Sequence, residues 1–181
     1  MPDAPLVLVG FMGCGKSTIG RRLAQRLGWY FCDLDEKIES EFGMDIPAIF
    51  ARCGESAFRR SEQEILDRCL ERAAGGQKLV LASGGGTFAQ PANFQRIQQC
   101  AVSIFLEVPL EQLLLRCAQM TNRPLFRDVD SFQALYRQRL PYYRQAHRSI
   151  ACGALEPEAI VDRIIAEVQA AAAPAAGRIH P

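Results

Sequence analysis

Short, uninterrupted apolar segments alternate along the chain with segments of helical periodicity, and this alternation limits the fold more than any other feature. Four apolar segments and a weaker fifth have the length of strands: 6–9, 29–32, 79–82, 102–106 and 149–151. Strands that are apolar on both faces are typical of a parallel sheet covered by helices on both sides. With 181 residues, of which 49% are hydrophobic, the chain fits one α/β domain.

Local signals refine this outline. The side chains of Asp45 and Ser131 can accept hydrogen bonds from first-turn amides, so we expect helices to start at these residues. Segment 33–61 adds short helical pieces between the second and third strands, and segment 118–130 is polar without periodicity; such insertions usually carry binding work. Segment 170–181 is rich in Ala and Pro and is expected to be a flexible tail.

Charge and cysteine content exclude several classes of protein. There are 21 Lys and Arg against 20 Asp and Glu, which leaves no electrostatic footprint for nucleic acid or an anionic membrane. No apolar run approaches the roughly 20 residues of a membrane span, and the first residues do not resemble a secretory signal. The seven cysteines are scattered without a C-x-x-C pair, which argues against a disulfide scaffold or a zinc site. We therefore expect a cytoplasmic protein, and a monomer because no long apolar stripe is evident.

A phosphate-binding loop follows the first strand. Residues 10–17, GFMGCGKS, fit the pattern G-x-x-x-x-G-K-[ST] between a strand and a helix, where the motif is required to lie. Its glycines let successive amides point at phosphate oxygens, Lys16 can reach the β- and γ-phosphates, and the Ser17 hydroxyl can ligate Mg²⁺. The guanine-specific string N-K-x-D is absent. A small-molecule kinase, a nucleotide kinase and a nucleotide-driven binding module remain open.

Two acids and a triple glycine follow the next strands. If the backbone is extended, Asp33 and Asp35 lie on the same side, where one can hold Mg²⁺ and the other can accept a proton from an attacking hydroxyl. Alternatively, the two acids begin the next helix, whose first turn favours negative charge. The glycines at 84–86 lie at the same edge of the sheet and permit close approach to a ligand, or form only a flexible turn.

Arginines offer a way to hold an anionic acceptor. Arg59 and Arg60 lie on the helical insertion, and Arg137 and Arg139 lie on a late helix. A pair of guanidinium groups from these two helices would suit bidentate capture of a carboxylate. The residues alone do not select which arginines converge.

Together these motifs resemble the shikimate kinase family. The segments GFMGCGKST, DLD, FRR, GGG, NRP and RLPYYRQ occur in the family's order and at similar spacing, over roughly residues 6–168. The resemblance implies the nucleotide-kinase type of phosphate-loop fold, with a five-stranded parallel sheet sandwiched by helices. It implies a single kinase domain over 1–169, with an acceptor-binding insertion at 33–61 and a lid at 118–130. The implied reaction transfers the γ-phosphoryl group of ATP, with Mg²⁺, to the 3-hydroxyl of shikimate.

The resemblance also implies residue roles. The implied catalytic residues are Lys16, Asp35 and Arg123. The implied ATP-binding residues are Gly13, Cys14, Gly15, Lys16, Ser17, Thr18, Arg116 and Arg123. The implied shikimate-binding residues are Asp35, Arg59, Gly84, Gly85, Gly86 and Arg139, and the implied metal ligands are Ser17 and Asp33.

Two other functions compete with this interpretation. A kinase for another small polyol acid, such as gluconate, would share the phosphate loop and a nearby acid. A catalytically silent ATP-binding regulatory module would share only the loop, and the intact Lys16, Asp35, Arg59, Arg123 and Arg139 argue against it.

Overall fold

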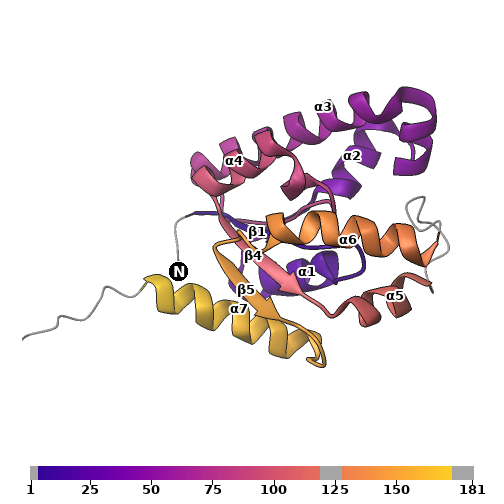
Figure 1. Cartoon of the computed structure of the whole chain (residues 1–181). Helices are drawn as coiled ribbons and strands as arrows, with labels where there is room; N and C mark the ends of the chain where they lie inside the picture. The colour runs from indigo at the N-terminus through magenta and orange to yellow at the C-terminus, as the bar shows by residue number, and fades with distance from the viewer. Residues whose placement is uncertain (1–3, 119–127, 173–181) are drawn as a thin grey trace, which may run out of the picture.

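Five short strands form one parallel sheet at the centre of the molecule (Figure 1). The computed structural model describes residues 4–118 and 128–172. The strands are β1 (Leu6–Val9), β2 (Tyr30–Asp33), β3 (Leu79–Ala82), β4 (Val102–Glu107) and β5 (Arg148–Ala151), in the spatial order β2-β3-β1-β4-β5. All four neighbouring pairs are parallel. The predicted five-stranded parallel sheet is therefore confirmed, with each strand within a residue or two of its apolar segment.

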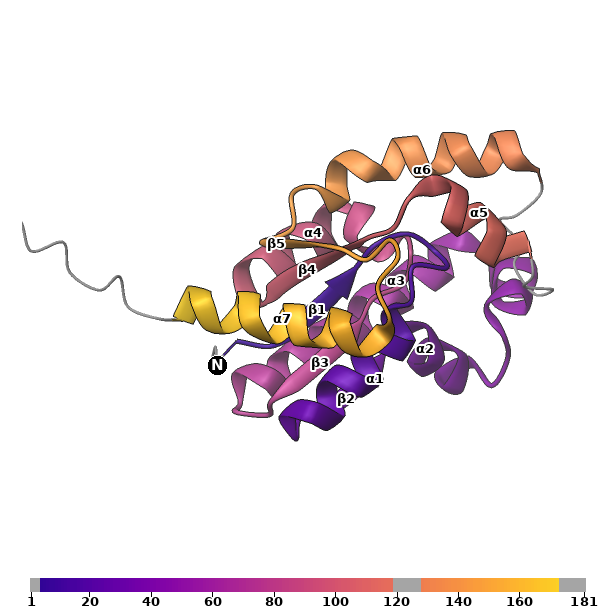
Figure 2. The ribbon, with the colours of Figure 1, turned by 90° about the horizontal axis from the view of Figure 1, so that it is seen from below.

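Helices cover the sheet on both sides. They are α1 (Lys16–Leu27), α2 (Leu34–Phe42), α3 (Ile46–Ala74), α4 (Pro91–Cys100), α5 (Leu110–Ala118), α6 (Val129–Tyr143) and α7 (Pro157–Ala172), with a 3₁₀ turn η1 (Thr87–Ala89). Helices α1 and α7 lie side by side on one face, and α3 and α4 lie on the other (Figures 1 and 2). Within residues 4–118 and 128–172, no helix is both long and apolar enough to cross a bilayer.

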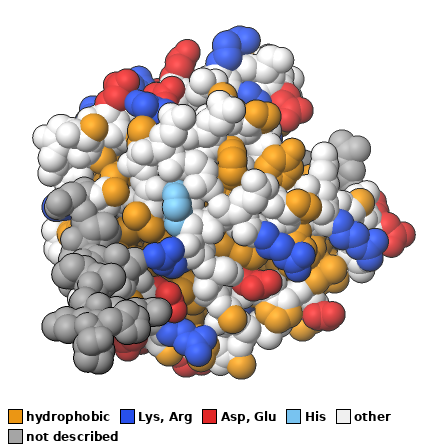
Figure 3. Space-filling model, turned by 60° about the vertical axis from the view of Figure 1, so that its left-hand side comes forward, with side chains coloured by type: hydrophobic (Ala, Val, Ile, Leu, Met, Phe, Trp, Pro, Cys, Tyr) orange, Lys and Arg blue, Asp and Glu red, His pale blue; other side chains and the backbone are white. Residues whose placement is uncertain are grey.

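Ion pairs on the surface connect α1 with α7. Arg26 donates to Asp162 at 2.6 Å, and Arg22 pairs with Glu158. These pairs are half-exposed, so each contributes only a few tenths of a kcal/mol up to about 1 kcal/mol. On the face drawn in Figure 3, Lys and Arg side chains occur alongside Asp and Glu, in agreement with the near-zero net charge.

One predicted helix start is confirmed and one is wrong. The Asp45 carboxylate accepts from the amide of Ala48 at 2.9 Å and begins α3. Helix α6 begins at Val129 rather than at Ser131, because the Asp128 carboxylate accepts from both the amide of Ser131, at 2.7 Å, and its hydroxyl, at 2.8 Å. Ser131 is thus inside the first turn, and the residue three positions earlier caps the helix.

The boundaries of the insertion and of the tail differ from expectation. Segment 33–61 contains α2 but only part of α3, which bends at Gly54 and continues to Ala74. Helix α7 extends to Ala172, so residues 170–172 of the predicted flexible tail are helical. The rest of that tail, and most of the predicted lid, lie outside the described residues.

The strand order places a topological switch point at the carboxyl ends of β1 and β3. From β1 the chain crosses to β2 on one side, whereas from β3 it crosses to β4 on the other. Open α/β sheets bind ligands where the connections diverge in this way. The phosphate loop follows β1 and the triple glycine follows β3, so both segments lie at this switch point.

Candidate active site

The phosphate loop has a backbone that only glycine adopts without strain. Gly13 has φ +78° and Gly15 has φ +97°, both in the left-handed region. A Cβ at Gly13 would also lie 2.8 Å from the sulfur of Cys117. Gly15 is the N-cap of α1 and has no side chain with which to cap the first-turn amides. Those amides and the helix dipole suit a phosphate group.

Lys16 lies over the loop that precedes it. Its ammonium donates to the carbonyl oxygens of Gly10, at 2.8 Å, and Phe11, at 3.0 Å, and to the buried sulfur of Cys14 at 3.6 Å. The charge is thereby held against the first residues of the loop. Ser17 and Thr18 follow in the first turn of α1 and are exposed.

The two acids after β2 do not share an extended segment; the alternative, that they begin the next helix, is confirmed. Asp33 ends β2, and its carboxylate caps α2 by accepting from the amides of Asp35, at 3.1 Å, and Glu36, at 3.3 Å. Asp35 is inside the first helical turn. Its carboxylate nevertheless reaches the triple glycine, since a Cβ at Gly84 would lie 2.6 Å from Asp35 Oδ1. Asp33 therefore caps α2, whereas the Asp35 carboxylate lies against the glycines that follow β3.

The triple glycine packs against the phosphate loop. The amide and hydroxyl of Ser83 both donate to the carbonyl oxygen of Leu8, at 3.1 and 2.9 Å, which fixes the segment to the end of β1. A Cβ at Gly85 would lie 3.4 Å from the amide nitrogen of Met12, in the phosphate loop. The two loops are thus adjacent, so a ligand bound to one would lie near a ligand bound to the other.

Two guanidinium groups converge on the end of the triple glycine. A Cβ at Gly86 would lie 3.1 Å from Nη2 of Arg59 and 3.1 Å from Nη2 of Arg139. Arg139 also donates to the carbonyl oxygen of Gly85 at 3.1 Å, and its guanidinium lies over the ring of Phe11. Helices α3 and α6, which are distant in sequence, therefore bring two positive charges to one point.

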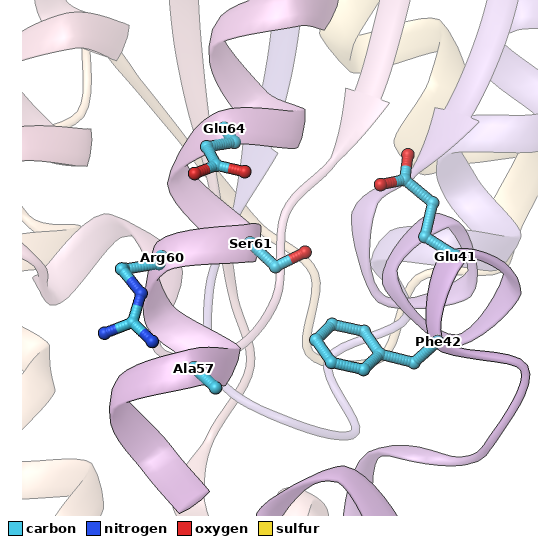
Figure 4. A pocket seen from close by; sticks show the side chains of 6 residues that line it. All are labelled: Glu41, Phe42, Ala57, Arg60, Ser61 and Glu64. Atoms are coloured by element: carbon cyan, nitrogen blue, oxygen red, sulfur yellow. The ribbon is translucent and has the colours of Figure 1, made fainter. Parts of the chain in front are cut away.

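The neighbouring arginines point elsewhere. Arg60 lines a separate cavity of about 370 Å³ between α2 and α3. In Figure 4, the ring of Phe42 extends from α2 toward α3, where Ser61 faces it. Arg137 donates to Gln133 on its own helix at 3.4 Å. The choice between arginines that the sequence left open is made by geometry.

Two residues at the site were not identified from the sequence. Glu62 is 1% exposed; its carboxylate accepts from Arg59 Nη1 at 2.8 Å and from the Thr87 hydroxyl at 2.7 Å. Tyr143 donates its hydroxyl to the carbonyl oxygen of Gly85. Burial raises the pKa of Tyr143, so the hydroxyl stays a donor. The sequence did contain a signal for each: Glu62 is three residues after Arg59, and Tyr143 is four residues after Arg139, so each pair lies on one face of its helix.

The nucleotide side of the site is partly described. Arg116, on α5, donates to the carbonyl oxygen of Gly13 at 3.4 Å and so lies beside the phosphate loop. Arg123 lies outside the described residues.

The donor set fits a magnesium ion that arrives with a nucleotide. The Ser17 hydroxyl is exposed, and the Asp33 carboxylate uses Oδ1 as a cap. Hydroxyl and carboxylate oxygens are ligands that Mg²⁺ accepts, and it commonly completes its shell with phosphate oxygens and water. Among the described residues, no three His, Cys, Asp or Glu side chains cluster as a metal cage.

A phosphate loop, an adjacent carboxylate and two converging arginines define a phosphate-loop kinase for a small anionic acceptor. Comparison with known proteins then gives the family. The model of the shikimate kinase family matches residues 12–169. The shikimate kinase of Rhodopseudomonas palustris is 43% identical over 167 residues, which cover 91% of this chain and 80% of that protein. The chain belongs to the shikimate kinase family and is an ATP-dependent kinase.

Solved structures agree with this assignment. The Acinetobacter baumannii shikimate kinase in complex with shikimate superimposes with a TM-score of 0.86 at 34% identity, covering 93% of this chain and 94% of that chain. A gluconokinase from Sinorhizobium meliloti superimposes with a TM-score of 0.59 at 20% identity, covering 94% of each chain. The gluconokinase likeness shows a shared fold and nothing about the acceptor.

Proposed function

We propose that this protein transfers the γ-phosphoryl group of ATP to the 3-hydroxyl of shikimate, giving shikimate 3-phosphate and ADP. The observation that carries the proposal is the convergence of Arg59 and Arg139 at Gly86, with Asp35 against Gly84. This arrangement of charges matches an acceptor with a carboxylate at one end, facing the two arginines, and a hydroxyl at the other end, facing Asp35. The shikimate complex of the Acinetobacter baumannii enzyme supports the same acceptor.

On the acceptor side, Arg59 and Arg139 bind the shikimate carboxylate through charge-assisted hydrogen bonds. The glycines at 84–86, Gly85 especially, contact the ring hydroxyls. Asp35 orients the attacking hydroxyl and accepts its proton as the oxygen bonds to the γ-phosphorus and the bond to ADP breaks. Because proton removal comes late in a loose transition state, Asp35 contributes more by orientation than by basicity.

On the nucleotide side, the amides of Gly13, Cys14, Gly15 and Thr18 and the ammonium of Lys16 hold the phosphates. Arg116 binds near the nucleotide base, and Arg123 closes over the phosphates. Ser17 and Asp33 would hold Mg²⁺, which would neutralise charge on the phosphates. Positioning and charge stabilisation, rather than a covalent enzyme intermediate, supply the rate.

An acceptor panel tests the proposed reaction. ADP release is measured separately with shikimate, gluconate and a nucleoside monophosphate. Of the three acceptors, only shikimate is expected to give turnover. Turnover with gluconate and not with shikimate would show that gluconate is the acceptor. ATP binding without turnover on any of the three would favour the regulatory module.

The two arginines of α6 give a matched test of the acceptor clamp. Arg139→Ala is expected to raise the KM for shikimate by an amount equivalent to about 2–5 kcal/mol, because a desolvated charge partner is lost. Arg137 lies two residues away and donates to Gln133 on the same helix. Arg137→Ala is expected to change the KM for shikimate less than about two-fold. An Arg139 effect confined to the KM for ATP contradicts the assignment.

The compartment and assembly are further parts of this proposal. The seven cysteines are scattered without a C-x-x-C pair, which supports a reducing compartment such as the cytoplasm. We propose a monomer, which light scattering of the purified chain tests directly.

A further inference from the structure

Two thiols meet between the edge strand of the sheet and the helix that covers it. Cys32 lies in β2 and Cys69 lies in α3, 37 residues later, and their sulfur atoms are 3.7 Å apart. Cys32 is buried at 5% exposure, whereas Cys69 is partly exposed. The pair is not used by the kinase reaction proposed above.

The surroundings favour reaction at the more accessible thiol. The hydrogen bond between the two sulfurs lowers the pKa of Cys69, because the Cys32 thiol can donate to a Cys69 thiolate. Lys37 on α2 and Arg68 and Arg72 on α3 lower it further through their positive charges, although burial acts in the opposite sense. A thiolate is the attacking species in thiol–disulfide exchange, so Cys69 is the residue that reacts first.

We propose that Cys32 and Cys69 form a redox-active dithiol that is reversibly converted to an internal disulfide by low-molecular-weight disulfides such as oxidised glutathione. In the first step the Cys69 thiolate attacks one sulfur of the small disulfide, forming a mixed disulfide and releasing one thiolate. In the second step Cys32 loses its proton to solvent or to the departing thiolate and attacks the Cys69 sulfur. The second small thiol leaves, so two protein thiols are oxidised and one small disulfide is reduced.

The two sulfurs need to move only a short distance for Cys32 to attack Cys69. A disulfide needs its sulfurs about 2.05 Å apart, so this pair must close by about 1.7 Å from its contact distance. The product ties β2, which ends at Asp33, to α3, which presents Arg59 and Glu62. Oxidation therefore links covalently the two elements that carry part of the proposed acceptor site.

The test uses the full chain, first fully reduced and then incubated with oxidised glutathione. Intact mass spectrometry is expected to show a product lighter by two hydrogens, and non-reducing digestion is expected to yield the peptide of Cys32 linked to that of Cys69. Dithiothreitol should restore the original mass. A stable glutathione adduct on Cys69 without the linked peptide, a link between other cysteines, or no reaction would each overturn the proposal.

Matched single variants separate this pair from the remaining thiols. Cys69→Ala is expected to abolish the internal disulfide, whereas Cys53→Ala, which removes an exposed cysteine elsewhere on α3, should leave it intact. Kinase activity of each reduced variant checks that the fold is retained. If a variant folds poorly, the linked peptide from the unmodified chain still shows whether Cys32 and Cys69 are joined. An internal disulfide of unchanged yield in Cys69→Ala would refute the assignment of Cys69 to the pair.

Discussion

The buried carboxylate of Glu62 offers a sharp test of how the acceptor site is built. It accepts from Arg59 at 2.8 Å and from Thr87 at 2.7 Å and is 1% exposed. Glu62→Gln preserves the shape, because the new amide oxygen can accept from Arg59 while its nitrogen donates to the Thr87 hydroxyl. What is lost is the negative charge that holds the guanidinium toward Gly86.

The magnitude follows from the loss of one of two opposite charges. Arg59 stays charged, so its bond to the amide remains charge-assisted; hydrogen bonds to charged groups contribute about 1.5–3 kcal/mol, and replacing an ion pair toward the upper end of that range by an ion–amide bond toward the lower end weakens the hold on Arg59 by about 1–1.5 kcal/mol. If Arg59 binds the shikimate carboxylate, the KM for shikimate should rise about five- to twelve-fold. The KM for ATP should stay within about two-fold because the phosphate loop is untouched.

The same arginine supplies the control. Arg59 also contacts Glu55 at 3.3 Å, but that carboxylate is 65% exposed. Because exposed pairs contribute little, Glu55→Gln should change the KM for shikimate less than about two-fold. Steady-state measurements of ADP release give both constants for both variants. Equal effects of the two substitutions, or a Glu62→Gln effect seen mainly in the KM for ATP, would refute the reasoning.

Three further predictions follow from single contacts. Lys16→Ala is expected to lower kcat by at least about 10²-fold with little change in thermal unfolding, and unchanged turnover in the ADP-release assay would remove Lys16 from the phosphate site. Gly84→Ala places a Cβ 2.6 Å from Asp35 Oδ1 and should destabilise the fold by about 1–3 kcal/mol in urea titrations while lowering turnover; wild-type values for both would contradict the close packing. Burial lowers the pKa of His147, whose Nδ1 accepts from the amide of Ser103 at 3.1 Å, so its contribution to stability is complete above about pH 6.5 and is lost as the pH falls below that value. Urea titrations across this range should show a flatter pH dependence for His147→Asn, and an identical slope would argue against the assignment.

The fold was predictable because its signals are local. The segments at 6–9 and 79–82 are apolar at every position, and both strands prove to be completely enclosed. The phosphate loop was equally evident, since its glycines and lysine stand between a strand and a helix. Asp45 as a helix cap depends only on its immediate neighbours.

The sequence misled or left alternatives open where two local signals competed. Ser131 and Asp128 are both good caps, and the carboxylate prevailed by accepting from the backbone and the hydroxyl of Ser131 together. For Asp33 and Asp35 the sequence left an extended segment and a helix start open, and the Asp33 carboxylate decides for the helix by capping α2. The catalytic and binding roles assigned to these acids stay predictions, which the kinetic experiments above address.

The amino-acid sequence alone determined the order of strands and helices, the phosphate loop and the family resemblance, because each depends on residues that are close together in the chain. The resemblance implied Arg59 and Arg139, but only the tertiary structure shows that their guanidinium groups converge at Gly86. Arg59 and Arg60 are adjacent in sequence, yet one faces Gly86 and the other lines a cavity between α2 and α3. Neighbouring residues on a helix point about 100° apart, so only the packing of α3 and α6 against the sheet selects the side chains that meet.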